Sequence, residues 1–300
     1  MKSPLDPALL ARLQRLDLAV GKILGGEIGG RRESVGRGSG TEFLEHRSYA
    51  PGDDLRYVDW NAYGRLGELY VKQFTAEERL HLVLFVDTSP SMDFGRHNKL
   101  ARARELAACL GFVALRRLDR VTLVSLGAPE TPPATFCGRA GAADLLRETF
   151  SLGTGIGPPR AGAVRRTLAS LPRRPATILL SDLLERACAT PDMAGEERAG
   201  LLRDLAARSV QATCLHLVDP SEENPSGLGR FRLIDAESGR GAVGTLDART
   251  LALYRERFRR HLAEVHRDAL AAHVRYVRVS TRDEPDEVVL STFRRAGVVQ

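Results

Sequence analysis

The chain has 300 residues, of which 43% are hydrophobic and 27% charged, and its formal net charge at pH 7 is +6. This composition is typical of an ordinary globular protein with a sizeable core, and it excludes a disordered chain. The four cysteines form no C-x-x-C pair, and neither a signal peptide nor an apolar run of about 18 residues is present, so we expect a cytoplasmic protein without a membrane span.

The first predicted element is an amphipathic helix that begins after Asp6, its N-cap, and ends at Gly25-Gly26. Residues 26–40 are rich in glycine and arginine, which predicts a loop. The alternative is binding of RNA, but the segment lacks the aromatic residues that stack on bases, so we consider nucleic-acid binding unlikely. Such binding would use three arginines of the loop, namely Arg31, Arg32 and Arg37.

The segment from Thr41 to Thr75 combines turn-forming residues, aromatic residues and opposite charges, and Leu69-Tyr70-Val71 is a strand candidate within it. We interpret its aspartates as turn acceptors and ion-pair partners of nearby arginines, with a catalytic or metal-binding cluster as the alternative. The aspartates concerned are Asp53, Asp54 and Asp59, beside the single tryptophan, Trp60. Residues 1–78 are therefore predicted to form an N-terminal part that consists of the helix, the loop and a small β-rich appendage.

From residue 79 to residue 300, helical and strand patterns alternate, which predicts an α/β domain with a doubly wound, mostly parallel sheet. The predicted strands span residues 82–86, 121–126, 176–180, 212–218 and 274–279, and a hairpin covers 231–243. The predicted helices include one striped by Leu106, Leu110, Val113 and Leu118, then 144–150, 163–171, 196–208, 248–272 and one more near the end of the chain.

The most informative motif follows the first of these strands. There the apolar run ends in Asp87-Thr88-Ser89-Pro90-Ser91, whose carboxylate and hydroxyl oxygens suit a hard divalent cation. Another strand ends in Ser181-Asp182, and parallel strands bring such ends to the same edge of the sheet. A glycine-rich loop at residues 153–157 could add the hydroxyl of Thr154. We therefore predict a site for Mg²⁺ (or Mn²⁺) formed by Asp87, Ser89, Ser91, Thr154 and Asp182.

Other known site patterns fit less well. Pro158 stands where a dinucleotide-binding loop would have its third glycine, and no G-x-x-x-x-G-K-[ST] phosphate-binding loop occurs. His266 and His273 lack an H-E-x-x-H motif, so we interpret them as exposed or structural histidines rather than as zinc ligands.

The order of the predicted ligands resembles the metal-ion-dependent adhesion site of von Willebrand factor A-type domains, although Ser181-Asp182-Leu183 departs from the Thr-Asp-Gly of those domains. A longer set of motifs resembles the bacterial family called domain of unknown function 58. This family resemblance implies a von Willebrand A-like fold and genetic association with MoxR-type AAA+ ATPases, without an established activity. The motifs that carry it are Gly38-Ser39-Gly40-Thr41-Glu42-Phe43, Arg47-x-Tyr49-x-Pro51-Gly52-Asp53-Asp54-x-Arg56, Asp59-Trp60 and Val86-Asp87-Thr88-Ser89-Pro90-Ser91-Met92.

The predicted ligands favour binding over catalysis. A cation that is held by hydroxyls and one or two carboxylates keeps residual positive charge and bound water, which an Asp or Glu of a partner can displace. We therefore predict a non-enzymatic protein-interaction module whose partner is a MoxR-type ATPase or its client. The alternative is a magnesium-dependent hydrolase that uses Asp87 and Asp182.

Overall fold

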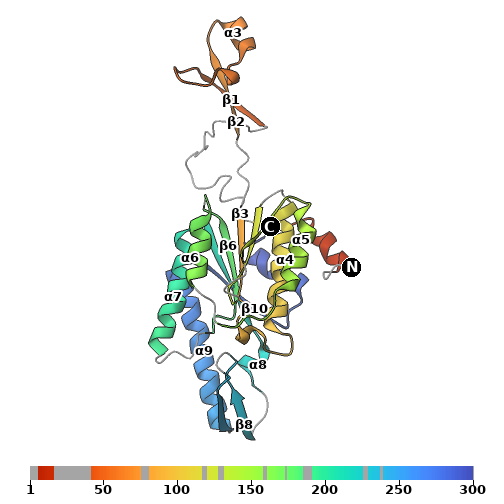
Figure 1. Ribbon diagram of the computed structural model, residues 1–300, viewed down its shortest axis with the longest axis vertical. Coiled ribbons are helices and arrows are strands. Elements are labelled where there is room, and N and C mark those ends of the chain that lie inside the picture. The colour runs from red at the N-terminus through yellow and green to blue at the C-terminus, as the bar shows by residue number, and fades with distance from the viewer. Residues whose placement is uncertain are drawn as a thin grey trace. The chain divides into compact units, whose positions relative to one another are not determined.

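The computed structural model describes residues 6–16, 42–75, 81–116, 120–127, 132–157, 161–172, 174–184, 191–225, 229–236 and 239–299. The chain divides into two units, one made of Met1–Gly21 with Leu80–Gln300 and the other of Lys22–Arg79. The larger unit contains a six-stranded sheet and the smaller unit a two-stranded sheet (Figure 1).

The six-stranded sheet has the strand order β10-β7-β6-β3-β4-β5, and all neighbouring strands are parallel except β4 and β5. The most central strands are buried along almost their whole length, which explains why their sequences show no polar alternation. The predicted doubly wound, mostly parallel sheet is confirmed. Its strands are β3 (His81–Val86), β4 (Arg120–Ser125), β5 (Ala134–Cys137), β6 (Ala176–Ser181), β7 (Gln211–Val218) and β10 (Arg275–Ser280).

Strand β3 lies where the direction of strand addition reverses. The chain adds β4 and β5 on one side of β3, and then β6, β7 and β10 on the other side. In open α/β sheets such a reversal leaves a crevice outside the carboxyl ends of the two strands concerned. Asp87 and Asp182, which directly follow β3 and β6, therefore lie at the strand ends where this topology places the crevice.

Helices cover both faces of the sheet (Figure 1), and each face has its own apolar core. One core is formed with α1 (Pro7–Leu13), α4 (Lys99–Arg116), α5 (Gly141–Ser151), η3 (Val288–Thr292) and α11 (Phe293–Arg295). The short helix α10 (Pro285–Glu287) directly precedes η3. The other core is formed with α6 (Ala161–Ser170), α7 (Pro191–Ala207) and α9 (Ala248–Ala271).

Helix α1 differs from the prediction in its length and in its place. The side chain of Asp6 accepts a hydrogen bond from the backbone N of Ala8 at 3.0 Å, as expected of an N-cap, but the helix ends at Leu13. Leu13 is fully buried in the core that includes α4. The helix thus belongs to the sheet unit and not to an N-terminal part of residues 1–78. The Gly/Arg loop with Arg31, Arg32 and Arg37 lies outside the described residues.

Two short elements connect β7 to α9. Helix α8 (Pro220–Glu223) follows β7 directly, and the antiparallel strands β8 (Gly229–Ile234) and β9 (Gly241–Leu246) form the hairpin that the sequence predicted. Among the helices of the described residues, none combines the length and the apolar character needed to cross a membrane.

In the smaller unit, β1 (Glu42–Ser48) pairs with β2 (Tyr70–Thr75) in antiparallel orientation. The connection between these strands contains the turn η1 (Leu55–Tyr57) and the helix α3 (Trp60–Leu66), which begins at the N-cap Asp59 and ends at Gly67. Gly67 has φ +74, a left-handed conformation that suits glycine at the end of a helix. The predicted strand at residues 69–71 corresponds to the start of β2, whereas β1 was not predicted.

Candidate metal centre

Asp87 is the first residue after β3, and its side chain is fully buried. Its Oδ1 accepts a hydrogen bond from the backbone N of Ser89 at 2.9 Å, and its Oδ2 accepts one from Ser181 Oγ at 2.6 Å. Because Ser181 is the last residue of β6, the second bond joins the ends of two adjacent strands. Burial, together with the nearby charge of Asp182, raises the pKa of Asp87 to about 6. A cation would therefore stabilise the ionised carboxylate in this position.

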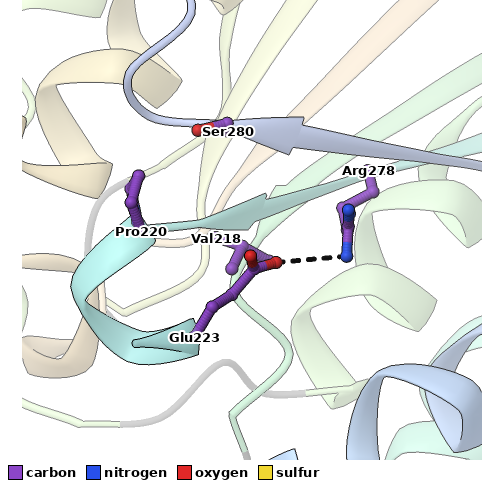
Figure 2. A pocket seen from close by; sticks show the side chains of 5 residues that line it. All are labelled: Val218, Pro220, Glu223, Arg278 and Ser280. Atoms are coloured by element: carbon purple, nitrogen blue, oxygen red, sulfur yellow. Dashed lines mark ion pairs between the residues drawn. The ribbon is translucent and has the colours of Figure 1, made fainter. Parts of the chain in front are cut away.

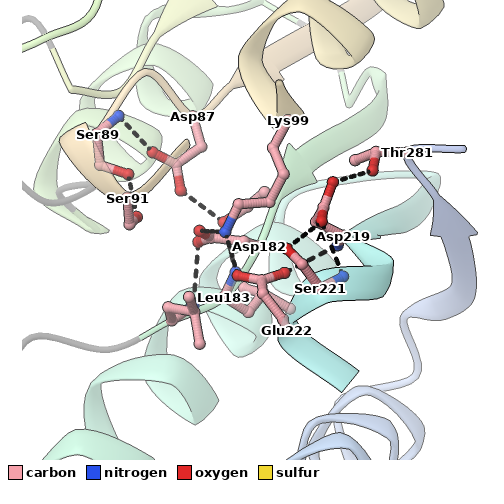
Figure 3. A network of polar contacts seen from close by, with 12 residues as sticks. Asp87, Ser89, Ser91, Lys99, Asp182, Leu183, Asp219, Ser221, Glu222 and Thr281 are labelled. Carbon is pink, nitrogen blue, oxygen red and sulfur yellow. Dashed lines mark hydrogen bonds and ion pairs between the residues drawn. The ribbon is translucent and has the colours of Figure 1, made fainter. Parts of the chain in front are cut away.

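Ser89 and Ser91 present their hydroxyl groups to each other. The two Oγ atoms lie 3.0 Å apart (Figure 3). Ser89 stands at the N-cap of the turn η2 (Pro90–Met92), but its side chain makes no capping hydrogen bond. When two oxygens occupy adjacent positions around an octahedral Mg²⁺, each about 2.1 Å from the metal, the two oxygens are about 3.0 Å apart. The two hydroxyls form a hydrogen bond with each other, and their spacing is also compatible with two ligands of one cation.

The loop that carries Thr154 is held against the end of β3. The backbone N of Gly155 donates to the carbonyl of Thr88 at 2.6 Å, and that of Ile156 donates to the carbonyl of Gly127 at 3.2 Å. A Cβ on Gly155 would lie 2.2 Å from the carbonyl oxygen of Gly127, so only glycine permits this approach. Thr154 itself is exposed and stays a predicted ligand beside the serine motif.

Asp182 is 1% exposed, and both of its carboxylate oxygens have partners. Its Oδ1 accepts a hydrogen bond from the backbone N of Leu184 at 3.1 Å, and its Oδ2 accepts one from Lys99 Nζ at 2.6 Å. The next residue, Leu183, has φ +49, a left-handed conformation that is uncommon for residues other than glycine. Its side chain is 4% exposed in the core, and this burial offsets the conformational cost.

Lys99 is one of the residues of this cluster that the sequence did not predict. It begins α4, its side chain is completely buried, and Nζ lies 2.6 Å from Asp182 Oδ2 and 2.6 Å from Glu222 Oε1 (Figure 3). Burial alone lowers the pKa of Lys99, but the charges of the two carboxylates outweigh burial and raise this pKa above its usual value. Lys99 is therefore a charged ammonium inside the protein.

A third strand of the sheet also ends in a carboxylate, which the sequence prediction did not include. Asp219 follows β7 and forms a capping box with Glu222 at the start of α8. Its Oδ2 accepts a hydrogen bond from the Oγ1 of Thr281, just beyond β10, at 2.8 Å. Burial raises the pKa of Asp219, but its hydrogen bonds with Ser221 and Thr281 outweigh this effect and lower it. The signal that could have identified it is the one used for Asp87, an apolar strand that ends in aspartate.

Histidines near the site have structural contacts. His216 on β7 is buried, and its Nδ1 lies 2.8 Å from the hydroxyl of Tyr276. Burial lowers the pKa of His216 to about 3, so this imidazole is neutral. The ring of His266 lies against Tyr276 with the ring centroids 5.0 Å apart.

Within the part of the chain that the structure describes, no three His, Cys, Asp or Glu residues are grouped as metal ligands, so the candidate site depends on hydroxyl ligands.

The aspartates of the smaller unit all have partners close in sequence. Asp53 accepts two hydrogen bonds from Arg47 Nη2, at 2.8 and 2.7 Å, and Asp54 Oδ2 accepts one from Arg56 Nη2 at 2.6 Å. Asp59 caps α3, and its Oδ2 lies 2.9 Å from His46 Nε2 and 3.3 Å from Lys72 Nζ. These contacts agree with the interpretation as turn acceptors and partners of arginines for Asp53 and Asp54, whereas Asp59 caps a helix and contacts His46 and Lys72.

A small cavity lies at the carboxyl ends of β7 and β10. It has a volume of about 80 Å³ and is lined by Val218, Pro220, Glu223, Arg278 and Ser280 (Figure 2). Arg278 and Glu223 form an ion pair in its wall at 3.1 Å. Pockets for small molecules usually have roughly 300–1,000 Å³, so this cavity is too small for a substrate.

Comparison with known proteins identifies the family. Residues 45–268 match the family described as protein of unknown function DUF58. The chain belongs to this family. Relatives of this DUF58 chain include the uncharacterized protein Rv1480 of Mycobacterium tuberculosis and the uncharacterized protein Mb1516 of Mycobacterium bovis. Each is 30% identical over 240 residues, which cover 78% of this chain and 73% of the relative. The family inferred from the motifs is thus confirmed.

Some solved structures resemble the DUF58 chain in fold. The conserved hypothetical protein BatB from Bacteroides thetaiotaomicron is 15% identical with a TM-score of 0.40, and the match covers 72% of this chain and 98% of that one. The pilus adhesin SpaC from Lactobacillus rhamnosus GG, in its open conformation, is 14% identical with a TM-score of 0.40, and the match covers 73% of this chain and 29% of that one. Likenesses at this level say nothing about the site, and the von Willebrand A-like relationship stays a prediction.

Proposed function

We propose that this protein is a protein-interaction module that binds one divalent cation, Mg²⁺ or Mn²⁺, and presents it to an acidic side chain of a protein partner. Asp87, Ser89 and Ser91 would hold the cation, and Thr154 and Asp182 are the further ligands expected from the sequence. The observation that carries the proposal is the pair of serine hydroxyls, 3.0 Å apart, next to a fully buried carboxylate at the crevice of the sheet. Oxygen ligands in this arrangement suit a hard cation.

The charges at this edge of the sheet support a divalent ion. Asp87, Asp182 and Glu222 are all at least nine-tenths buried, and Lys99 is the cation that contacts two of them. When these groups are ionised, three negative charges face one positive charge. Buried carboxylates are costly unless a cation or hydrogen bonds compensate them. A divalent cation would compensate part of this negative charge, to which the buried Asp219 at the end of β7 also contributes.

The same arrangement supports binding of a partner rather than catalysis. A cation with one carboxylate and two neutral hydroxyls as ligands keeps positive charge, which favours an additional anionic ligand from outside. Asp182, the carboxylate that could serve as a base for bound water, already accepts hydrogen bonds from Lys99 and Leu184. A general base must lie within hydrogen-bonding reach of the water whose proton it takes, and the ion pair with Lys99 holds Asp182 in a different contact. The family resemblance suggests a MoxR-type ATPase or its client as the partner.

The decisive experiment is calorimetric titration of the full chain with Mg²⁺. We expect one binding site per chain in the wild type and none in Asp87→Ala. Asp93→Ala is the matched control, because Asp93 is an exposed carboxylate just beyond the serine motif and its removal should leave binding unchanged. Equal Mg²⁺ binding by the wild type and Asp87→Ala would rule out the site.

A second experiment separates binding from hydrolysis. Purified MoxR-type ATPase should be captured by the wild type in Mg²⁺, and capture should be lost with chelator and in Asp87→Ala. Metal-dependent turnover of phosphoesters or peptides that disappears in both Asp87→Ala and Asp182→Ala would instead favour the hydrolase.

A further inference from the structure

Lys99 is a fully buried lysine at the edge of the sheet where the proposed metal would bind. Lysine side chains are almost never fully buried unless they are paired. The side chain of Lys99 is 0% exposed, and the carboxylates of Asp182 and Glu222 that it contacts are 1% and 9% exposed. These two carboxylates come from different elements, since Asp182 follows β6 and Glu222 belongs to α8. Their oxygens thus converge on one point, and the ammonium group occupies it (Figure 3).

The two carboxylates at the crevice differ in the partners that they have. Asp182 Oδ2 is 2.6 Å from the charged Nζ of Lys99. Asp87 accepts hydrogen bonds only from neutral groups in the contacts that the structure describes, the backbone N of Ser89 and the hydroxyl of Ser181. The charge of Asp182 is therefore compensated within the protein, whereas that of Asp87 is not.

We propose that Lys99 acts as a built-in cation that fills the position between Asp182 and Glu222, so that a divalent metal is held directly by a single carboxylate, that of Asp87. This inference rests on the proposed metal site and deepens it, because it assigns Asp182 to the lysine instead of to the metal. Lys99 is then a residue that sets the strength and the selectivity of the site. Because Lys99 pairs with Asp182, the metal has only one anionic ligand from the protein. The metal therefore keeps positive charge that attracts an acidic side chain of a partner.

Two consequences follow from electrostatics. The ammonium group repels a divalent cation nearby, so its removal should strengthen metal binding. Without Lys99, the carboxylate of Asp182 also becomes available as a second anionic ligand. We expect Mg²⁺ to bind the Lys99→Met variant about tenfold more tightly than the wild type, or better still. Lys99→Arg keeps the positive charge and should stay within about threefold of the wild type.

Calorimetric titration of the full chain with Mg²⁺ tests this expectation. Tighter binding by Lys99→Met, together with near wild-type binding by Lys99→Arg, supports the proposal. A folded Lys99→Met variant that binds Mg²⁺ as the wild type does, or more weakly, overturns it. If the wild type itself binds no Mg²⁺, the proposed function fails, and that outcome is distinct from unchanged affinity in the variant.

Loss of Lys99 leaves two buried carboxylates without a counter-charge, which could prevent the single variant from folding. A second pair of variants therefore tests the proposal with one of these carboxylates removed. Glu222→Gln and the double variant Lys99→Met/Glu222→Gln differ only in the lysine, and the double variant removes both members of one ion pair. Mg²⁺ should bind the double variant about tenfold more tightly than the single variant. Equal affinities would contradict the role of Lys99.

A third measurement uses the wild type alone. In nuclear magnetic resonance spectra, the ¹⁵N signal of the Lys99 ammonium should persist when Mg²⁺ is added, because the lysine keeps its two carboxylates. Loss of this signal on saturation with Mg²⁺ would mean that the metal displaces the lysine, and the proposal would be wrong.

Discussion

The sheet edge and the hairpin segment of residues 42–75 both gather aspartates, but they balance the charges in different ways. In the hairpin segment, Asp54 pairs with Arg56 two positions away, and Asp53 pairs with Arg47 six positions away. At the sheet edge, Lys99 is 83 positions from Asp182 and 123 positions from Glu222. The charges of the hairpin segment are thus compensated locally, whereas those of the sheet edge depend on the folded structure.

Burial makes this difference important for function. The ion pair of Asp54 and Arg56 is exposed, with side chains 40% and 81% accessible, and such pairs contribute little to stability. Asp87 and Asp182 are at most 1% exposed, where an uncompensated charge is costly. A surplus of buried carboxylates therefore needs compensation by a cation, by hydrogen bonds or by protonation, whereas an exposed cluster of aspartates does not.

The largest predicted effect concerns stability. Lys99→Met should lower the free energy of unfolding of the sheet unit by about 3–5 kcal/mol, because it leaves two buried carboxylates without a counter-charge. Lys72→Met is the matched change in the hairpin segment, where the lysine is partly exposed beside Asp59, and it should cost far less. Denaturant unfolding followed by far-ultraviolet circular dichroism measures the first effect. Fluorescence of Trp60, the single tryptophan, measures the unfolding of the hairpin segment in Lys72→Met.

This comparison fails if the two lysine variants lose similar stability. Such a result would mean that the buried ion pairs of Lys99 contribute no more than an exposed pair, and the contrast between the two regions would disappear.

The second prediction concerns pH. Because the pKa of Asp87 is raised to about 6 by burial and by Asp182, protonation should compete with metal binding. The Mg²⁺ affinity should fall about tenfold between pH 7.5 and pH 5. Without metal, the stability of the fold changes with pH in the opposite direction. The raised pKa of Asp87 contributes stability that is fully present below about pH 4 and is lost as the pH rises through about 6.

Calorimetry at the two pH values, together with thermal unfolding with and without Mg²⁺, checks this prediction. The increase in melting temperature on addition of Mg²⁺ should be larger at pH 7.5 than at pH 5. An affinity that is independent of pH in this range would show that Asp87 is not the carboxylate that holds the metal.

The smallest predicted effect concerns the loop with Thr154. Gly155→Ala should weaken Mg²⁺ binding a few-fold, because the new Cβ would lie 2.2 Å from the carbonyl oxygen of Gly127 and the loop must move. Gly153→Ala is the matched control, since a Cβ there meets no atom within 4 Å. Titration of both variants with Mg²⁺ measures the difference. Equal affinities would indicate that the loop and Thr154 take no part in the site.

The sequence by itself determined the fold class, and it predicted the candidate ligands at the end of one strand. The unbroken apolar run of β3 predicted a strand of a parallel sheet covered on both faces, because such strands need no polar alternation, and the alternation of helices and strands predicted the doubly wound fold. The motif after β3 gave Asp87, Ser89 and Ser91, since a strand end places neighbouring residues together. Such signals are local and can be recognised without knowledge of the rest of the fold.

The tertiary structure alone decided which charged group faces Asp182. Nothing in the helical pattern around Lys99 distinguishes a buried lysine from an exposed one, and only the packing of α4 beside β6 and α8 brings its ammonium to Asp182 and Glu222. The same holds for helix α1, whose Leu13 is buried in the core of the sheet unit although the chain order suggested an N-terminal part. Contacts between residues far apart in sequence depend on the whole fold, because they form only when distant segments pack together and exclude water.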